Sequence, residues 1–237
     1  MSWLGHSRID LIECGSTNDE AAKLARAGAA HGTIVIAERQ TAGRGREGRV
    51  WQSPTGNVYL SAVLRPPLAP GDVPPLTLAI GIGACDAVRE FGAHVQLKWP
   101  NDLYVAGKKL AGVLVEAQSQ GAKLESVIVG IGVNLATMPE LPTATVLGTG
   151  IDREQLVARL LAHVEHWIDR YVAGGISAIV PAWRERMLAD LRLRAGDLAG
   201  TLVDLDDDGA LLLRTDGGDV HRIRSGAVEL DGTDRNR

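Results

Sequence analysis

Three glycines and three arginines alternate in the stretch Gly43-Arg44-Gly45-Arg46-Glu47-Gly48-Arg49, which is followed directly by Val50 and Trp51. Because it lacks a Cβ atom, glycine can adopt positive φ and bring the backbone close to a ligand. The arginine guanidinium is always charged, and its donors are arranged to bind a carboxylate or a phosphate. The stretch therefore predicts a loop that binds an anion.

The same glycines fit the dinucleotide-binding pattern G-x-G-x-x-G, but the surrounding sequence does not. That pattern needs a preceding strand, a following helix and an acidic residue about 20 positions further on. Residues 33–37 supply a strand, whereas residues 52–57 are typical of a turn and residues 58–64 of another strand. No acidic residue lies between Glu47 and Asp72. We therefore expect neither a nicotinamide nor a flavin site here.

The composition is that of a folded protein without an overall basic charge. Apolar residues make up 45% of the 237 residues and the net charge is −4, which argues against a non-specific nucleic-acid binder. Cys14 and Cys85 are the only cysteines, so two free thiols in a reducing compartment are expected. No apolar run suits a signal peptide or a membrane span. We expect a cytoplasmic protein without membrane contact.

Hydrophobic periodicity and turn signals predict a mixed series of strands and helices. The expected strands are residues 8–12, 33–37, 58–64, 95–99, 108–116 and 126–134, and the expected helices are residues 17–27, 76–91, 152–171 and 176–191. Thr17 and Glu20 match the S/T-x-x-E capping box at the start of the first helix. Residues 65–75 are rich in proline and predict a loop. Residues 137–150 are expected to form a flap.

From residue 193 onward the sequence predicts short strands joined by tight turns. The candidates are residues 198–205, 210–214, 219–224 and 227–230, with Asp208-Gly209 as a hairpin turn. We expect a small β-barrel domain at residues 191–237, after a catalytic domain at residues 1–190. The sequence assigns no metal ligands.

Four short motifs follow one another along the chain in a characteristic order and spacing. They are Ser16-Thr17-Asn18, residues 40–49 with Trp51, Lys98-Trp99-Pro100-Asn101-Asp102 and Lys109-Leu110-Ala111-Gly112. Together they closely resemble the biotin–protein ligases, enzymes that biotinylate the carrier domains of carboxylases. The resemblance implies an α/β (α+β) fold with a mixed sheet and flanking helices, like class II aminoacyl-tRNA synthetases and the biotin–lipoate ligases. A small C-terminal SH3-like β-barrel would follow.

The resemblance departs from the family pattern in two places. Bifunctional members carry an N-terminal helix-turn-helix that binds DNA, whereas here the catalytic motifs begin close to Met1. The chain is therefore similar to the monofunctional type, and no DNA partner is expected. Glu47 stands where some relatives have another arginine, which lowers the positive charge of the loop.

A reaction in two steps follows from the resemblance. Biotin and ATP would form biotinyl-5′-AMP, and a lysine of the biotin carboxyl carrier protein would then attack this mixed anhydride and release AMP. Both steps develop negative charge, so fixed cations and positioning are the main requirements. Mg²⁺ would shield the triphosphate and the leaving pyrophosphate. Without ligand, the glycine–arginine loop is expected to be mobile and to order over the adenylate.

The resemblance also assigns roles to single residues. Those matched to biotin binding are Ser16, Thr17, Asn18, Gln40, Gly43, Arg44, Gly45, Arg46, Lys109, Gly112 and Gly130. Those matched to ATP binding are Arg46, Arg49, Trp51, Lys109 and Asn134. The catalytic candidates are Lys109 and Arg46, which face the biotin carboxylate and the α-phosphate, and Asp102. Asp102 would orient the incoming lysine or accept its proton, or alternatively would organise the loop.

Two rival functions fit part of the same pattern. A lipoate–protein ligase shares the fold and the adenylate chemistry, although the R-G-R loop and the Lys-Trp-Pro-Asn-Asp run favour biotin. A non-catalytic biotin-sensing repressor or binding module is the other rival, and the presence of Lys109 argues against it.

Overall fold

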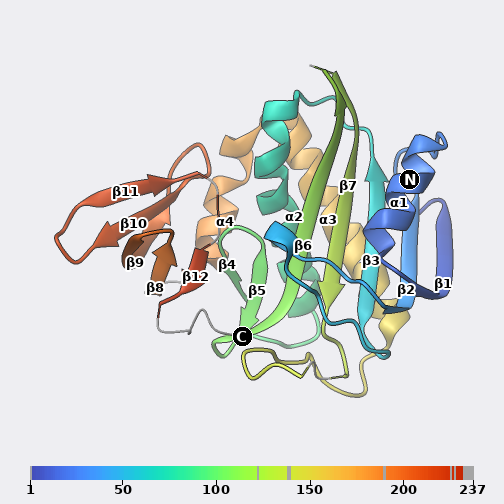
Figure 1. Cartoon of the computed structure of the whole chain (residues 1–237), viewed down its shortest axis with the longest axis horizontal. Helices are drawn as coiled ribbons and strands as arrows, with labels where there is room; N and C mark the ends of the chain where they lie inside the picture. Colours follow the sequence, from blue (N-terminus) through green and yellow to red (C-terminus); the bar gives the residue numbers. More distant parts are fainter. Residues whose placement is uncertain are drawn as a thin grey trace.

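The structure is a computed structural model that describes residues 2–121, 123–137, 140–188, 191–224, 226 and 228–231. The described residues form a seven-stranded sheet in the order β1-β2-β3-β7-β6-β5-β4 and a five-stranded sheet in the order β11-β10-β9-β8-β12 (Figure 1). The strands of the large sheet are β1 (Arg8–Cys14), β2 (Ile34–Gln40), β3 (Val58–Leu64), β4 (Gln96–Lys98), β5 (Asp102–Val105), β6 (Lys108–Gln120) and β7 (Lys123–Val133). The main helices are α1 (Thr17–Arg26), α2 (Val73–Arg89), α3 (Arg153–Gly174) and α4 (Val180–Arg186).

The large sheet is mixed, as the resemblance implies. Strands β1 and β2 are parallel and α1 connects them, because parallel neighbours need a crossover. The other neighbouring pairs are antiparallel. Strand β3 is buried along its whole length, which explains its continuous apolar sequence.

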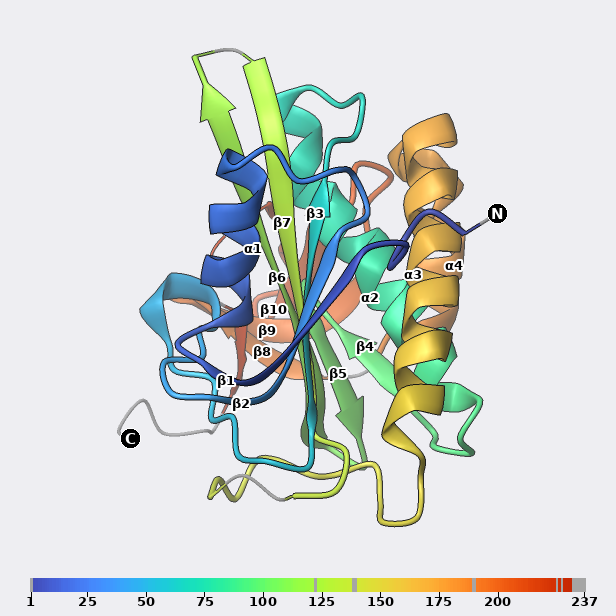
Figure 2. The same cartoon turned by 90° about the vertical axis from the view of Figure 1, so that its right-hand side faces the viewer.

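Helices cover both faces of this sheet (Figure 2). Helix α1 packs on one face through a small apolar cluster that includes Ala21, Val35 and Ile128. Helices α2 and α3 pack on the other face and belong to the main core. Helix α2 is apolar nearly all round because it lies between the sheet and α3. The two faces therefore differ: α2 and α3 complete the core, and α1 leaves room beside it for a site.

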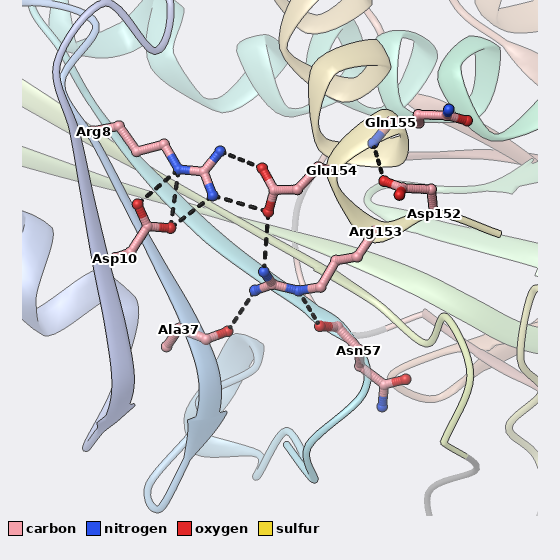
Figure 3. A network of polar contacts seen from close by, with 8 residues as sticks. All are labelled: Arg8, Asp10, Ala37, Asn57, Asp152, Arg153, Glu154 and Gln155. Atoms are coloured by element: carbon pink, nitrogen blue, oxygen red, sulfur yellow. Dashed lines mark hydrogen bonds and ion pairs between the residues drawn. The ribbon is translucent and has the colours of Figure 1, made fainter.

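A polar network fastens the start of α3 to the edge of the sheet (Figure 3). Asp152 caps the helix by accepting a hydrogen bond from the backbone N–H of Gln155. Arg8 of β1 pairs with Glu154 at 2.6 Å, and Arg153 donates to a backbone carbonyl of β2 at 3.1 Å. Such half-exposed pairs contribute up to about 1 kcal/mol each. Their clearest effect is to orient α3 relative to β1 and β2.

The five-stranded sheet consists of β8 (Arg192–Ala195), β9 (Leu198–Leu205), β10 (Leu211–Thr215), β11 (Val220–Ile223) and β12 (Val228–Leu230). All its described pairings are antiparallel, which agrees with the expected SH3-like barrel. Two contacts join it to the large sheet. The indole N–H of Trp99 donates to the carbonyl of Gly209 at 3.0 Å, and Lys98 Nζ donates to the carbonyl of Val228 at 2.6 Å.

The capping-box prediction is wrong. Ser16 is the N-cap of α1, its side chain makes no capping hydrogen bond, and Thr17 is already helical. The Thr17 hydroxyl instead lies 3.0 Å from Gln40 Oε1 on the neighbouring strand. The Thr17 hydroxyl therefore donates to a tertiary partner and does not accept the local backbone N–H of a capping box.

Several element boundaries also differ from the predictions. Helix α2 begins at Val73 because Pro74 and Pro75 fit the first turn, where no intrahelical N–H is needed. Helix α4 ends at Arg186 because Met187 is extended and the N–H of Leu188 donates to Leu97 of β4. Strands β5 and β8 were not predicted. Residues 138–139 of the expected flap, residues 189–190 and residue 227 lie outside the described residues.

Among the described residues, no helix has the length and apolar character needed to cross a membrane.

Candidate active site

A cavity of about 180 Å³ lies on the α1 side of the large sheet. Its walls come from the start of α1, the glycine–arginine loop, strands β5, β6 and β7, and Val228 of β12. All the site residues predicted from the sequence line it except Gly43 and Asn134. The fold thus brings together residues that are widely separated in the chain.

Backbone hydrogen bonds close the glycine–arginine loop on itself. The N–H of Gly45 donates to the carbonyl of Arg49 at 2.7 Å, and the N–H of Trp51 donates to the carbonyl of Gly43 at 2.9 Å. A Cβ atom on Gly43 would lie 2.5 Å from both Ser53 Oγ and the Trp51 carbonyl. Gly43 therefore has a supporting role behind the cavity, where only glycine fits.

One wall of the cavity is polar and uncharged. Gln40 Oε1 accepts hydrogen bonds from the backbone N–H of Thr17 at 2.8 Å and from its hydroxyl at 3.0 Å. Gln40 Nε2 donates to Ser53 Oγ at 2.8 Å. The buried Ser61 hydroxyl lies 2.7 Å from Thr17 Oγ1 and 2.6 Å from Asn18 Oδ1. This network fixes the directions of donors and acceptors before a ligand binds.

Glycines on β6 and β7 make the floor of the cavity. Gly112 and Gly132 are opposite each other in the sheet, and the Trp51 indole packs over them. A Cβ atom on Gly132 would lie 2.7 Å from Trp51 Nε1, and one on Gly130 would lie 2.2 Å from Asn18 Oδ1. These glycines are therefore required by close packing of Trp51 and Asn18 against the backbone.

The opposite end of the cavity carries the charged groups. Lys109 Nζ forms an ion pair with Asp102 Oδ1 at 2.7 Å and lies 5.2 Å from the centre of the Trp51 ring. The backbone of Lys109 is held on both sides, because its N–H donates to Thr143 at 2.8 Å and its carbonyl accepts from Thr145 at 2.9 Å. The expected flap therefore pairs with the start of β6 and fixes the position of Lys109.

Three cations of the cavity reach the region of β12. Lys98 Nζ donates to Val228, Arg46 Nη2 donates to the carbonyl of Gly226 at 3.3 Å, and Arg49 lies 3.7 Å from Glu229 Oε1. Burial lowers the pKa of Lys98, since the charged ammonium loses contact with water. The barrel thus completes the cationic wall.

Lys98, Asn101 and Val228 also line the cavity, and no role was predicted for them from the sequence. Lys98 and Asn101 belong to a motif that was recognised, but the burial of Lys98 and the contact of Asn101 with Arg46 could not be derived from it. Asn101 Oδ1 accepts from Arg46 Nη1 at 3.4 Å. No local pattern marks Val228, because its role depends on the docking of the barrel.

Asn134 lies apart from the cavity. It is buried, and its Nδ2 donates to the carbonyl of Thr145 at 3.1 Å, which ties the end of β7 to the segment beside Lys109. The described part of the chain contains no group of three or more His, Cys, Asp or Glu residues that could hold a metal ion.

Comparison with known protein families gives one match for each of the two parts of the chain. Residues 13–134 match the Biotin/lipoate A/B protein ligase family, and residues 190–231 match the Biotin protein ligase C terminal domain. The bifunctional ligase/repressor BirA of Bacillus subtilis is 37% identical over 232 residues, which cover 91% of this chain and 71% of that protein.

Two further relatives resemble nearly the whole chain. The biotin–[acetyl-CoA-carboxylase] ligase of Paracoccus denitrificans is 35% identical over 223 residues, which cover 86% of this chain and 92% of that protein. A structure of the Aquifex aeolicus biotin protein ligase in complex with biotin and ATP has a TM-score of 0.80 and 30% identity. It covers 95% of this chain and 98% of its own. The cavity, the two sheets and these matches show that the chain belongs to the biotin/lipoate A/B protein ligase family.

Proposed function

We propose that this protein is a biotin–protein ligase that activates biotin with ATP and transfers the biotinyl group to a lysine of a carrier protein. One observation supports the proposal above all. A single small cavity combines the uncharged polar wall around Gln40 and Thr17 with the cationic end around Lys109 and Arg46. Biotin has the matching order of groups, a neutral ureido ring at one end and a carboxylate at the other.

The biotin ring would lie against the polar wall. Its ureido group has two N–H donors and one acceptor oxygen, and hydroxyl and amide side chains can satisfy them. Ser16, Thr17, Gln40 and Arg44 provide such groups, with Asn18 beside them. Gly112 and Gly130 line the cavity, so the backbone of the sheet would lie close to the ring, beside the Trp51 and Asn18 side chains that pack against these strands.

Activation requires two anions to react with each other. The biotin carboxylate attacks the α-phosphate of ATP, and pyrophosphate leaves. Lys109 and Arg46 would neutralise charge at the carboxylate and the α-phosphate, and Arg49 would act further along the phosphates, because fixed cations stabilise charge that develops in the transition state. Trp51 would contact the nucleotide.

Mg²⁺ would enter with ATP and shield its phosphates. Asp102 is the one carboxylate that lines the cavity among the described residues. The phosphates and water would therefore supply most ligands of the ion, as is usual for Mg²⁺.

Asp102 is suited to the transfer step. It is largely buried, with 13% of its side chain exposed, and it pairs with Lys109 at the cationic end of the cavity. The attacking lysine must lose a proton as it forms the amide bond, and Asp102 would orient this lysine or accept its proton. We infer that the acceptor is the carrier domain of acetyl-CoA carboxylase or of a related carboxylase, and that the reaction takes place in the cytoplasm.

The decisive test is ATP–pyrophosphate exchange that depends on added biotin. The purified protein should catalyse exchange with biotin and not with lipoate, followed by transfer of labelled biotin to a carrier domain. Exchange with lipoate alone would favour a lipoate ligase. Biotin binding without any exchange would favour the non-catalytic biotin sensor.

The variant Arg46→Ala tests the retention of the intermediate. Arg46 is held by Asn101 and by the carbonyl of Gly226 at the cavity mouth. Its loss should release biotinyl-5′-AMP into solution and biotinylate lysines of unrelated proteins. Labelling that stays confined to the carrier domain would exclude this role.

A further inference from the structure

Glu116 of β6 forms a junction just outside the cavity. Its Oε2 accepts a hydrogen bond from Asn18 Nδ2 at 2.6 Å and from Arg44 Nη2 at 3.0 Å. The same Arg44 nitrogen lies 2.8 Å from Asp19 Oδ1. One carboxylate therefore contacts both α1 and the glycine–arginine loop, and a second carboxylate from α1 holds the loop at the same point.

The alternation of the strand explains why Glu116 reaches this place. Gly112, Leu114 and Glu116 have the same parity in β6, so their side chains point to the side of the sheet where α1 and the cavity lie. The side chain of Glu116 is 37% exposed. Its charge therefore lies at the rim of the cavity, where Arg44 of the glycine–arginine loop can pair with it.

Asn18 depends on Glu116 for its orientation. The Asn18 side chain is buried, its Oδ1 is held by the Ser61 hydroxyl at 2.6 Å, and Gly130 leaves no space on the other side. Its Nδ2 therefore points to Glu116. If that acceptor were removed, a buried amide would lose its partner.

The loop has a tight end and a loose end. At the tight end, Arg44 is held at 2.8 Å and 3.0 Å by Asp19 and Glu116. At the loose end, Arg46 lies 3.3 Å from the carbonyl of Gly226, and Arg49 is 3.7 Å from its carboxylate partner in the barrel. Charge-assisted contacts weaken with distance, so the tight end contributes most to holding the loop.

We propose that Glu116, together with Asp19, is a positioning residue that holds the loop closed through Arg44 and slows the escape of the acyl-adenylate. The inference rests on the proposed function, because only an enzyme that forms biotinyl-5′-AMP has an intermediate to retain. Glu116 does not line the cavity. It acts through Arg44 and Asn18.

The test compares three variants with a matched control. Glu116→Gln and Asp19→Asn remove one charge each, and a double variant removes both. The control is Glu13→Gln, which removes a carboxylate that pairs with Arg39 of β2, and neither residue lines the cavity. Thermal unfolding of each protein checks that it is folded.

Two readouts separate positioning from a general structural effect. The first is the rate at which biotinyl-5′-AMP leaves the purified complex, which should rise about fivefold when one half-exposed pair is lost. The double variant should release it faster still and should label bystander lysines. The second is steady-state exchange, in which the KM for biotin should rise while the KM for ATP stays constant. Glu13→Gln should change neither readout.

Each outcome has one meaning. Release from the double variant at the wild-type rate would overturn the inference. Absence of biotin-dependent exchange in the wild-type protein would instead refute the proposed function. If Glu116→Gln fails to fold, Asp19→Asn on the surface of α1 and the salt dependence of release from the wild-type enzyme still decide. Added salt should speed release, since it screens half-exposed pairs. If neither the Asp19→Asn substitution nor added salt changes the release rate, the inference is also overturned.

Discussion

Gly130→Ala is the sharpest test of the packing that forms the polar wall. The added Cβ atom would lie 2.2 Å from Asn18 Oδ1 and 3.0 Å from its Cγ. Asn18 cannot simply turn away, because Ser61 holds its Oδ1 and Glu116 holds its Nδ2, each at 2.6 Å. Either the amide moves and loses these hydrogen bonds, or β7 moves and disturbs the sheet.

The expected cost combines three contributions. Overpacking a well-filled site costs about 1–3 kcal/mol, and the loss of a hydrogen bond costs about 1 kcal/mol. Replacing glycine restricts the unfolded chain and returns about 0.5–1 kcal/mol. Gly130→Ala should therefore destabilise the protein by about 2 kcal/mol. For a chain of this size the melting temperature should fall by about 4–8 °C.

Thermal unfolding and biotin titration calorimetry measure the two consequences. The affinity for biotin should fall together with the stability, because the displaced Asn18 amide borders the proposed ring site. In the double variant Gly130→Ala/Asn18→Ala, the clash is absent, so its destabilisation should be about 1–2 kcal/mol smaller than the sum of the single effects. Strict additivity, or a Gly130→Ala protein with unchanged melting temperature and biotin affinity, would refute the reasoning.

Three further predictions concern stability and chemistry. In α2, Gly81→Ala should stabilise the protein by up to about 1 kcal/mol, because the added Cβ atom would contact only Leu97, at 3.6 Å. Gly83→Ala should destabilise the protein, because its Cβ atom would lie 2.7 Å from the backbone of α3. Denaturant unfolding of the two variants measures this difference in sign. Lys109→Ala should reduce biotin-dependent exchange by about 10²–10³-fold while calorimetry still detects biotin binding, and full exchange would exclude its role. Burial raises the pKa of Tyr59 to about 12 from the ordinary 10.0, so the unfolded chain loses this proton first and stability falls as pH rises through that window. Tyr59→Phe should flatten that alkaline loss, as measured by unfolding at several pH values.

The strand and helix pattern was largely predictable from the sequence. The apolar run of β3 and the short strands after residue 193 have strong local signals, and the structure contains both. The errors fell where a tertiary partner replaced a local one. Thr17 donates to Gln40 and does not form the predicted capping box. Helix α4 ends at Arg186 because the residues after it pair with β4.

Which residues meet in the cavity was only partly predictable. The resemblance named the motifs, and the fold places almost all of their assigned residues around one space. It did not reveal the partners of those residues. Arg44 and Glu116 are 72 positions apart, and Lys98 and Val228 are 130 positions apart. Contacts across such separations depend on strand order and on the docking of the barrel.

The sequence by itself determined the chemistry that the chain carries and the places where its backbone must approach closely. Glycines at positions 43, 112 and 130 and the cations around them are local facts, since the residue type alone sets backbone freedom and charge. Only the tertiary structure decided that Lys109 pairs with Asp102 and that Arg44 is held by Glu116. The physical reason is that the attraction between two charges weakens with distance, and the distance between residues remote in sequence is set by the packing of the whole fold.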